Sequence, residues 1–242
     1  MESWETKIFR RKNFYGGNSI VNKQTAIDIH LKALDSVGFN GKIYFSCLGQ
    51  ALKDARKASG RNENSGDLDR LEGSHSWLGA IAYLMLVDQI GECYKNPAKG
   101  ESSYSIPFRK ALHYFSDLTQ SDNKVLYGLR SSLVHNYSLV SRFRRDPNDP
   151  WDYCYVFGLQ ADSNSPLIIP PNEKWRGDIS LIEREKHSTT ITLRKVGDLV
   201  EKMYKYIIDL HGKGQLEITM DPEELVKCFT FSVYDSTPPS GR

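Results

Sequence analysis

The chain has 242 residues, of which 39% are hydrophobic and 26% charged, and its formal net charge is +2. This length fits one large domain or two small ones, and the hydrophobic content excludes an intrinsically disordered chain. The small net charge excludes a polycation, so a polyanionic partner would have to bind to a local basic patch.

The cysteines and the apolar runs indicate the type of protein. The four cysteines form no CxxC pair and have no histidine at ligand spacing, which argues against a zinc site and a disulfide framework; they are Cys47, Cys93, Cys154 and Cys228. We expect them to be reduced, buried thiols. The N-terminus lacks the apolar stretch of a signal peptide, and the run from Trp77 to Val87 is too short for a membrane span. We therefore expect a soluble, cytoplasmic protein without membrane contact, metal or cofactor.

Three helices are predicted in the first hundred residues, after a segment 1–21 without an assigned structure. Apolar residues recur at helical spacing over residues 22–37 and again over residues 43–55. A longer helix is predicted over residues 68–94, where the apolar run reads as a buried core helix. Pro97 ends it, because proline cannot continue the helical hydrogen bonds.

Two more helices are predicted before residue 150. Pro107 fits the first turn of a helix that runs to Phe115. Ser121 or Asp122 is the expected N-cap of the next helix, which runs to about Phe143 and contains the segment LYGLRSSLVHNYSLV.

Strands are predicted after residue 150, because large apolar residues alternate at Tyr153, Tyr155, Phe157 and Leu159. Residues 167–169, 179–182 and 189–193 complete a small antiparallel sheet. An amphipathic helix is expected over residues 195–210, and Asp221-Pro222 begins a short last helix before a loose tail. The prediction is a mainly α protein, α+β overall, with a helical bundle (1–146), a β excursion (147–194) and a closing helix and tail (195–242), packed as one compact domain.

Arg130 and His135 are the residues that suggest chemistry. A guanidinium matches phosphate oxygens, and an imidazole moves protons near neutral pH. The same spacing also occurs at Arg70 and His75, so the pattern alone is not specific. Context favours the first pair, since Leu126, Leu129 and Leu133 form a helical stripe that can hold it rigidly.

Helical geometry predicts where the two side chains point. At about 100° per residue, Arg130 lies at the edge of the apolar stripe and His135 points to roughly the opposite side. His135 then faces solvent, another layer of the fold or a second subunit. The alternative is that Arg130 extends from the core edge to water and His135 is an ordinary surface histidine.

The segment LYGLRSSLVHNY resembles the signature of the HEPN superfamily (higher eukaryotes and prokaryotes nucleotide-binding domains), helical bundles with an Arg-x(4–6)-His motif. The resemblance covers mainly residues 65–145. In a branch paired with nucleotidyltransferase antitoxins the motif extends to Arg-x4-His-x-Tyr, and here Tyr137 stands at that position. Active members usually carry Asn, Asp or His after the arginine, where this chain has Ser131.

The resemblance implies a HEPN-like fold and a metal-independent endoribonuclease, a toxin or phage-defence effector that acts as a homodimer. His135 would be the general base or acid at the RNA 2′-hydroxyl, and Arg130 would stabilise charge on the phosphate. The 2′-hydroxyl as nucleophile implies RNA, not DNA, as partner. An antitoxin or regulatory protein is a further possible partner. Tyr137 would contact substrate or be modified; the alternative is a core tyrosine in line with Leu133.

Basic and aromatic residues near the motif offer further contacts. Arg142, Arg144 and Arg145 follow the motif helix and can bind phosphates, or they merely complement the helix dipole. Tyr153, Tyr155 and Phe157 can stack on bases, but alternating aromatic residues in a strand are more often core. Two other readings of the chain stay open: a non-catalytic HEPN-like module that binds RNA, a nucleotide or a protein, and a purely structural helical protein.

Overall fold

The structure is a computed structural model that describes residues 21–31, 37–39, 42–70, 76–141, 152–158 and 165–233. Its helices in these residues are α2 (Lys23–Leu31), α3 (Cys47–Ala58), α4 (Trp77–Cys93), α5 (Pro107–Phe115), α6 (Gln120–Asn136), α7 (Arg184–His187), α8 (Leu193–Gly212) and α9 (Pro222–Phe229), with 3-10 turns η2 (Pro97–Lys99) and η3 (Ile179–Leu181). Its strands are β1 (Val37–Phe39), β2 (Lys42–Ser46), β3 (Tyr94–Lys95), β4 (Val140–Ser141), β5 (Tyr153–Gly158), β6 (Ile168–Ile169), β7 (Ser188–Thr192), β8 (Glu217–Ile218) and β9 (Thr230–Val233). The chain is mainly helical with small sheets, as the sequence predicts.

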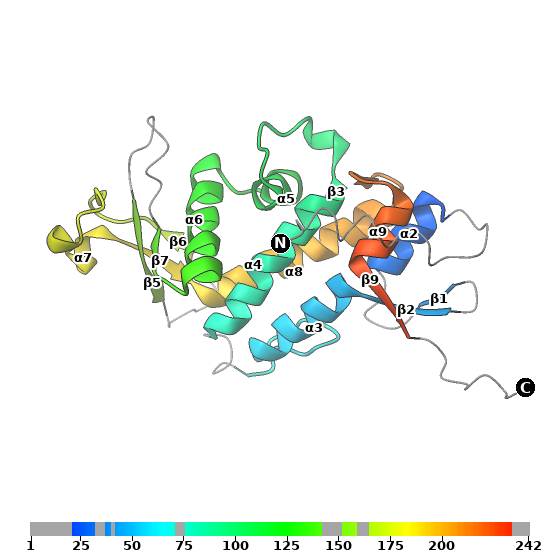
Figure 1. Ribbon diagram of the computed structural model, residues 1–242. Coiled ribbons are helices and arrows are strands. Elements are labelled where there is room, and N and C mark those ends of the chain that lie inside the picture. Colours follow the sequence, from blue (N-terminus) through cyan, green and yellow to red (C-terminus); the bar gives the residue numbers. More distant parts are fainter. Residues whose placement is uncertain are drawn as a thin grey trace, which may run out of the picture.

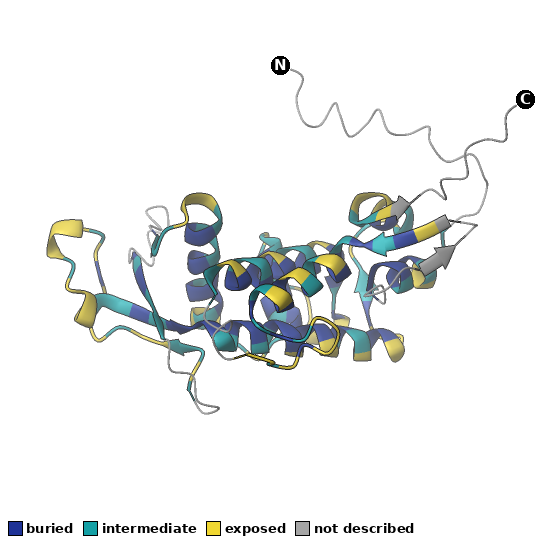
Figure 2. Ribbon diagram, turned by 90° about the horizontal axis from the view of Figure 1, so that it is seen from below, coloured by how far each residue is buried: buried dark blue, intermediate teal, exposed yellow. Residues whose placement is uncertain are grey.

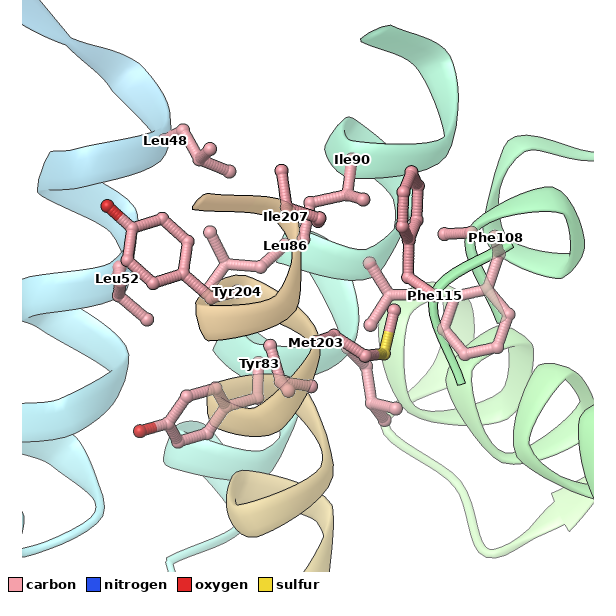
Figure 3. Close-up of a cluster of buried hydrophobic side chains, with 14 of the residues drawn as sticks. Leu48, Leu52, Tyr83, Leu86, Ile90, Phe108, Phe115, Met203, Tyr204 and Ile207 are labelled. Atoms are coloured by element: carbon pink, nitrogen blue, oxygen red, sulfur yellow. The ribbon is translucent and has the colours of Figure 1, made fainter. Parts of the chain in front are cut away.

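The hydrophobic core lies where α8 packs against α3, α4 and α5 (Figure 3). α8 buries residues at the spacing of one helical face, among them Val196, Met203 and Ile207. α4 is apolar around most of its circumference, and Tyr83 and Ile90 are almost fully buried. Because these two helices form the centre, the elements that carry charged side chains pack around them.

Small sheets stand at the two ends of this helical centre (Figure 1). One sheet has the strand order β1-β2-β9, and the other has the order β4-β5-β7-β6. α6 stands between α5 and the second sheet. The hydroxyl of Tyr155 on β5 donates to the carbonyl of Val125 on α6 at 2.9 Å, which ties this helix to the sheet. Figure 2 shows buried residues along the central helices and exposed ones at the α7 end.

A buried ion pair joins α3 to α8, and a tyrosine of α4 also binds to it. Arg56 donates from Nε and Nη2 to the two carboxylate oxygens of Glu201 at 2.7 and 2.8 Å, and Tyr83 donates its hydroxyl to Oε1 at 2.8 Å. Burial and the charge of Glu201 raise the pKa of Tyr83. Since every polar atom of the Glu201 carboxylate is paired, the cluster fixes the register of three helices.

The first two predicted helices were wrong in part. The predicted helix over residues 22–37 contains α2, its residues 32–36 lie outside the described residues, and Val37 lies in strand β1 instead of a helix. Residues 42–46 form strand β2, and the helix begins only at Cys47. The reason is Ser46, whose hydroxyl accepts from the N–H of Gly49 at 3.0 Å and caps α3, while Ile43 and Phe45 before it favour a strand.

The long helix and the motif helix also differ from their predicted bounds. α4 begins at Trp77, capped by Ser76, whereas Leu68 forms an isolated bridge with Arg61. α6 begins after Thr119, which accepts from the N–H of Asp122, so neither Ser121 nor Asp122 is the cap. The helix ends at Asn136, well before Phe143. The predicted helix over Pro107–Phe115 is confirmed.

The β excursion contains the strands predicted at residues 153, 168 and 189, but residues 179–181 form a 3-10 turn. The predicted antiparallel arrangement holds for β4–β5 and β6–β7, whereas β5 and β7 pair in parallel. A parallel pair needs a long crossover, which the segment between them supplies. The last two helices are confirmed, and strand β9 after α9 was not foreseen.

Two predictions about the type of protein can be compared with the described residues. Cys93 and Cys154 are buried as expected, whereas Cys47 is half-buried and Cys228 exposed. In the described part of the chain, every helix is too short or too polar to cross a membrane.

Candidate functional site

The candidate site is built on α6, which carries both Arg130 and His135. One face of α6 is buried through Leu126, Leu129 and Leu133. Arg130 lies at the edge of this face, with 20% of its side chain exposed, and His135 is exposed in the last helical turn. The helix therefore holds the pair at the surface while its apolar face anchors it to the core.

Asp88 on α4 fixes the guanidinium of Arg130. Nε of Arg130 donates to Oδ2 of Asp88 at 2.6 Å. The backbone N–H of Phe108, in the first turn of α5, also donates to this carboxylate. Partial burial raises the pKa of Asp88, and the charge of Arg130 and these hydrogen bonds oppose that rise. Asp88 thus holds one edge of the guanidinium and leaves the Nη atoms available.

Sequence reasoning missed Asp88, although the chain contains a signal for it. Asp88 is the one charged residue between Trp77 and Gly91, in an otherwise apolar helix. A carboxylate in such a run has to find a partner, because a buried unpaired charge is costly. The partner comes from another helix, and its identity is not visible in the sequence.

Gly91 allows α5 to approach α4 closely enough for Phe108 to reach Asp88. A Cβ atom at Gly91 would lie 1.8 Å from the carbonyl oxygen of Pro107, which is far inside van der Waals contact. Gly91 is one helical turn from Asp88, so it lies on the same side of α4. The glycine and the aspartate therefore act together to place the first turn of α5 behind the ion pair.

Arg130 and His135 are in direct contact, which the sequence did not predict, although His135 is exposed as helical geometry predicts. Nη1 of Arg130 lies 3.3 Å from Nε2 of His135. The long arginine side chain reaches the histidine along the surface of the helix while Asp88 holds Nε. A guanidinium only donates, so Nε2 accepts and the ring proton is on Nδ1. The one lone pair of the imidazole thus accepts from a permanent cation, and a substrate hydroxyl has to replace Nη1 to reach it.

Tyr137 is the C-cap of α6 and is exposed, so the alternative of a core tyrosine in line with Leu133 is wrong. Its backbone is left-handed, with φ 49° and ψ 43°, and its N–H donates to the carbonyl of Leu133. The reversal of chain direction turns the side chain out of line with Leu133 and leaves 60% of the residue exposed. Its ring centroid is 5.5 Å from that of Trp77 on α4.

The remaining predicted residues are only partly described. Ser131 is half-buried next to Arg130 on α6. Arg142, Arg144 and Arg145 lie outside the described residues, as does His75 of the second Arg/His match. Tyr155 is buried core, as the more common interpretation of alternating aromatic residues predicts.

A cavity of about 320 Å³ lies at the other end of α6, between its first turns and the second sheet. Both polar and apolar side chains line the cavity, among them Asp122, Asp152, Tyr153, Trp175 and His187. Within the described ranges, no three His, Cys, Asp or Glu side chains come together as a group that could hold a metal ion.

Comparisons of the chain with protein-family models, with curated proteins and with solved structures find no match.

Proposed function

We propose that the chain is a metal-independent endoribonuclease of HEPN type, with Arg130 and His135 as its catalytic residues. The observation that carries the proposal is the contact of 3.3 Å between Arg130 Nη1 and His135 Nε2 at the protein surface. The contact puts a permanent cation for a phosphate next to a proton acceptor for a hydroxyl. Asp88 supports the proposal because it restricts the guanidinium to one orientation.

In the proposed reaction the 2′-oxygen of RNA attacks the adjacent phosphorus and the bond from phosphorus to the 5′-oxygen breaks. Arg130 Nη1 turns from the imidazole to the phosphate, which frees Nε2 of His135 to take the 2′-hydroxyl proton, and the leaving 5′-oxygen takes a proton from water or from the imidazole of a second copy of the chain. Arg130 stabilises the charge that develops on the phosphate oxygens. The products are a 2′,3′-cyclic phosphate and a 5′-hydroxyl, and DNA is not cleaved because it lacks the nucleophile.

We further propose that the enzyme acts as a homodimer, as a toxin or defence effector that an antitoxin or regulatory protein restrains. The sequence resemblance motivates this proposal. It gains support from Leu78 and Met85, which are 65% and 53% exposed on α4. Met85 lies one helical turn before Asp88 and Leu78 two turns before Met85, so a second copy that covers this side of α4 would meet the first close to the Arg130/His135 pair.

A non-catalytic HEPN-like module that binds RNA, a nucleotide or a protein is the second candidate. The ion pair with Asp88 favours it, because the carboxylate neutralises part of the charge that Arg130 offers to a phosphate. Ser131, where active members carry other residues, points the same way. Such a module would bind RNA without turnover.

RNA incubated in EDTA with the purified protein tests the proposal. We expect cleavage by the wild type and a loss of at least about a hundredfold in Arg130→Ala and in His135→Ala, since each removes one of two essential groups. Arg184→Ala, an exposed arginine on α7, is the matched control and retains activity. Equal cleavage by all variants, or none by the wild type on varied RNAs, would contradict the proposal.

A further inference from the structure

Tyr137 and Trp77 form an aromatic surface beside the candidate site, and we propose that it stacks on an unpaired nucleobase next to the bound phosphate. The inference rests on the proposed function in one respect, since it takes RNA as the ligand. It adds a binding site to the Arg130/His135 pair and a substrate class, single-stranded RNA.

The backbone of Tyr137 is the first reason. Among the described residues it is the one non-glycine residue with a positive φ. The closing hydrogen bonds of α6, from the N–H groups of Tyr137 and Ser138, come from the backbone alone, and glycine is the residue that usually occupies such a position. A bulky residue held in this conformation is strained, and residues strained in this way cluster at functional sites.

The packing of the ring is the second reason. The ring of Trp77 lies at 5.5 Å and 40° to the ring of Tyr137, and Phe157 on β5 packs edge-on against Trp77 at 4.7 Å and 85°. Three elements thus contribute to one aromatic cluster. Trp77 and Phe157 are half-buried, whereas Tyr137 is 60% exposed. The two inner rings support a tyrosine whose remaining surface is open to a ligand.

The position of the cluster relative to Arg130 is the third reason. Tyr137 follows His135 by two residues and lies roughly 10 Å along the helix from Arg130. At this separation a phosphate on Arg130 and a base on Tyr137 belong to the same short stretch of a strand. A base inside a duplex has both faces covered by its neighbours, so only an unpaired base can stack on the ring.

Binding of a single-stranded RNA with 2′-O-methyl riboses tests the proposal without cleavage, because the nucleophile is blocked. We expect Tyr137→Asn, which tolerates the left-handed backbone, to weaken binding about 5- to 150-fold, the range for one stacked base. Tyr137→Phe keeps the ring and stays near the wild type. The control is Phe231→Thr, an exposed aromatic residue on the sheet at the far end.

Two further readouts separate stacking from charge. Tyr137→Asn should leave the slope of log affinity against log salt unchanged, whereas Arg130→Ala should reduce it by about one. An RNA with one abasic site at the stacking position should bind the wild type more weakly by the same factor as the substitution does. The abasic site should not weaken binding to Tyr137→Asn any further.

Binding by Tyr137→Asn within twofold of the wild type, equal competition by duplex RNA, or no RNA binding by the wild type would overturn the inference. If the aromatic surface binds another protein and not a nucleobase, the wild type will not bind the RNA. The cleavage assay decides the proposed function separately. Cleavage that needs Arg130 and His135 but not Tyr137 leaves that function standing, and Tyr137-dependent binding without cleavage supports the stacking site alone.

Discussion

Asp88 is the residue that determines how much of Arg130 faces outward. Its carboxylate accepts from Nε at 2.6 Å and from the N–H of Phe108, so two helices restrain it. Nη1 then reaches His135 at 3.3 Å. An arginine without this anchor would sample many orientations, because its side chain has several free torsions.

Asp88→Asn is therefore expected to lower kcat for RNA cleavage, on the order of a hundredfold, through misplacement of the guanidinium. Steady-state kinetics measure the effect, with a melting curve to establish that the variant is folded. Glu92→Gln, one turn further along α4 and exposed, is the control. An unchanged kcat in Asp88→Asn would show that Arg130 needs no anchor.

His30 is a buried residue that makes stability depend on pH. Its Nδ1 is 2.5 Å from the Tyr94 hydroxyl and its Nε2 is 3.1 Å from Nε2 of Gln89. Burial lowers the pKa of His30 from 6.5 to about 3. Since the unfolded chain binds a proton at His30 below pH 6.5 and the folded chain does not, this residue reduces stability progressively as the pH falls from 6.5 towards 3.

His30→Gln should therefore weaken the acid dependence of the free energy of unfolding. Between pH 7.5 and 5.5 the free energy of unfolding of the wild type should fall by about 1.4 kcal/mol more than that of the variant. This amount corresponds to one pH unit below the pKa of His30 in the unfolded chain. Urea titrations at the two pH values measure the difference. Parallel losses in the two proteins would mean that His30 is protonated in the folded state.

At the scale of elements, the approach of α5 to α4 depends on Gly91. A methyl group there overlaps the carbonyl of Pro107, so Gly91→Ala has to push α5 away. We expect a loss of about 1–3 kcal/mol of stability, together with reduced cleavage as Phe108 withdraws from Asp88. Thermal unfolding and the cleavage assay measure the two effects.

Gly212→Ala on α8 is the control for that substitution. Its Cβ would meet nothing within 4 Å, so alanine should be neutral or slightly stabilising. If Gly91→Ala behaved like Gly212→Ala, the close approach would have no energetic consequence.

The helices were predictable where their periodicity is strong, and their ends were not. The apolar spacing in α8 predicts that helix because one buried face produces the pattern, and Pro107 predicts the start of α5 because proline fits the first helical turn. The end of α6 at Tyr137 was missed because a tyrosine gives no sign of a left-handed backbone. The parallel pairing of β5 with β7 was missed because strand direction depends on a crossover that alternation does not encode.

The candidate site was predictable as a pair of residues but not as a geometry. The motif identified Arg130 and His135, and helical angles placed His135 on the exposed side of the helix, but neither predicts a contact between the two side chains. The contact between them depends on Asp88, a residue distant in sequence, and on the reach of a long side chain. Trp77 was likewise counted only as part of an apolar run, and its contact with Tyr137 is tertiary.

At the scale of the whole molecule, one core supports the two helices that carry the candidate site. The buried cluster includes Ile27 on α2 and Leu225 on α9 at one end and Tyr155 on β5 at the other, and the Arg56–Glu201 pair joins α3 to α8 within it. α4 and α6 are therefore held from behind, while their outer faces carry Asp88, Arg130, His135 and the aromatic surface of Tyr137. A rigid support with an open face is what a site for a long polymer requires.

The chemistry of the RNA ends left by cleavage tests the central claim most directly. Products formed by the wild type in EDTA and analysed by mass spectrometry should carry 2′,3′-cyclic phosphates, or the monophosphates from their hydrolysis, and 5′-hydroxyl groups, because the 2′-oxygen is the nucleophile. Neither product should form with His135→Ala. Products with 3′-hydroxyl and 5′-phosphate ends would contradict the account, since they require water to attack the phosphorus and a different set of catalytic groups.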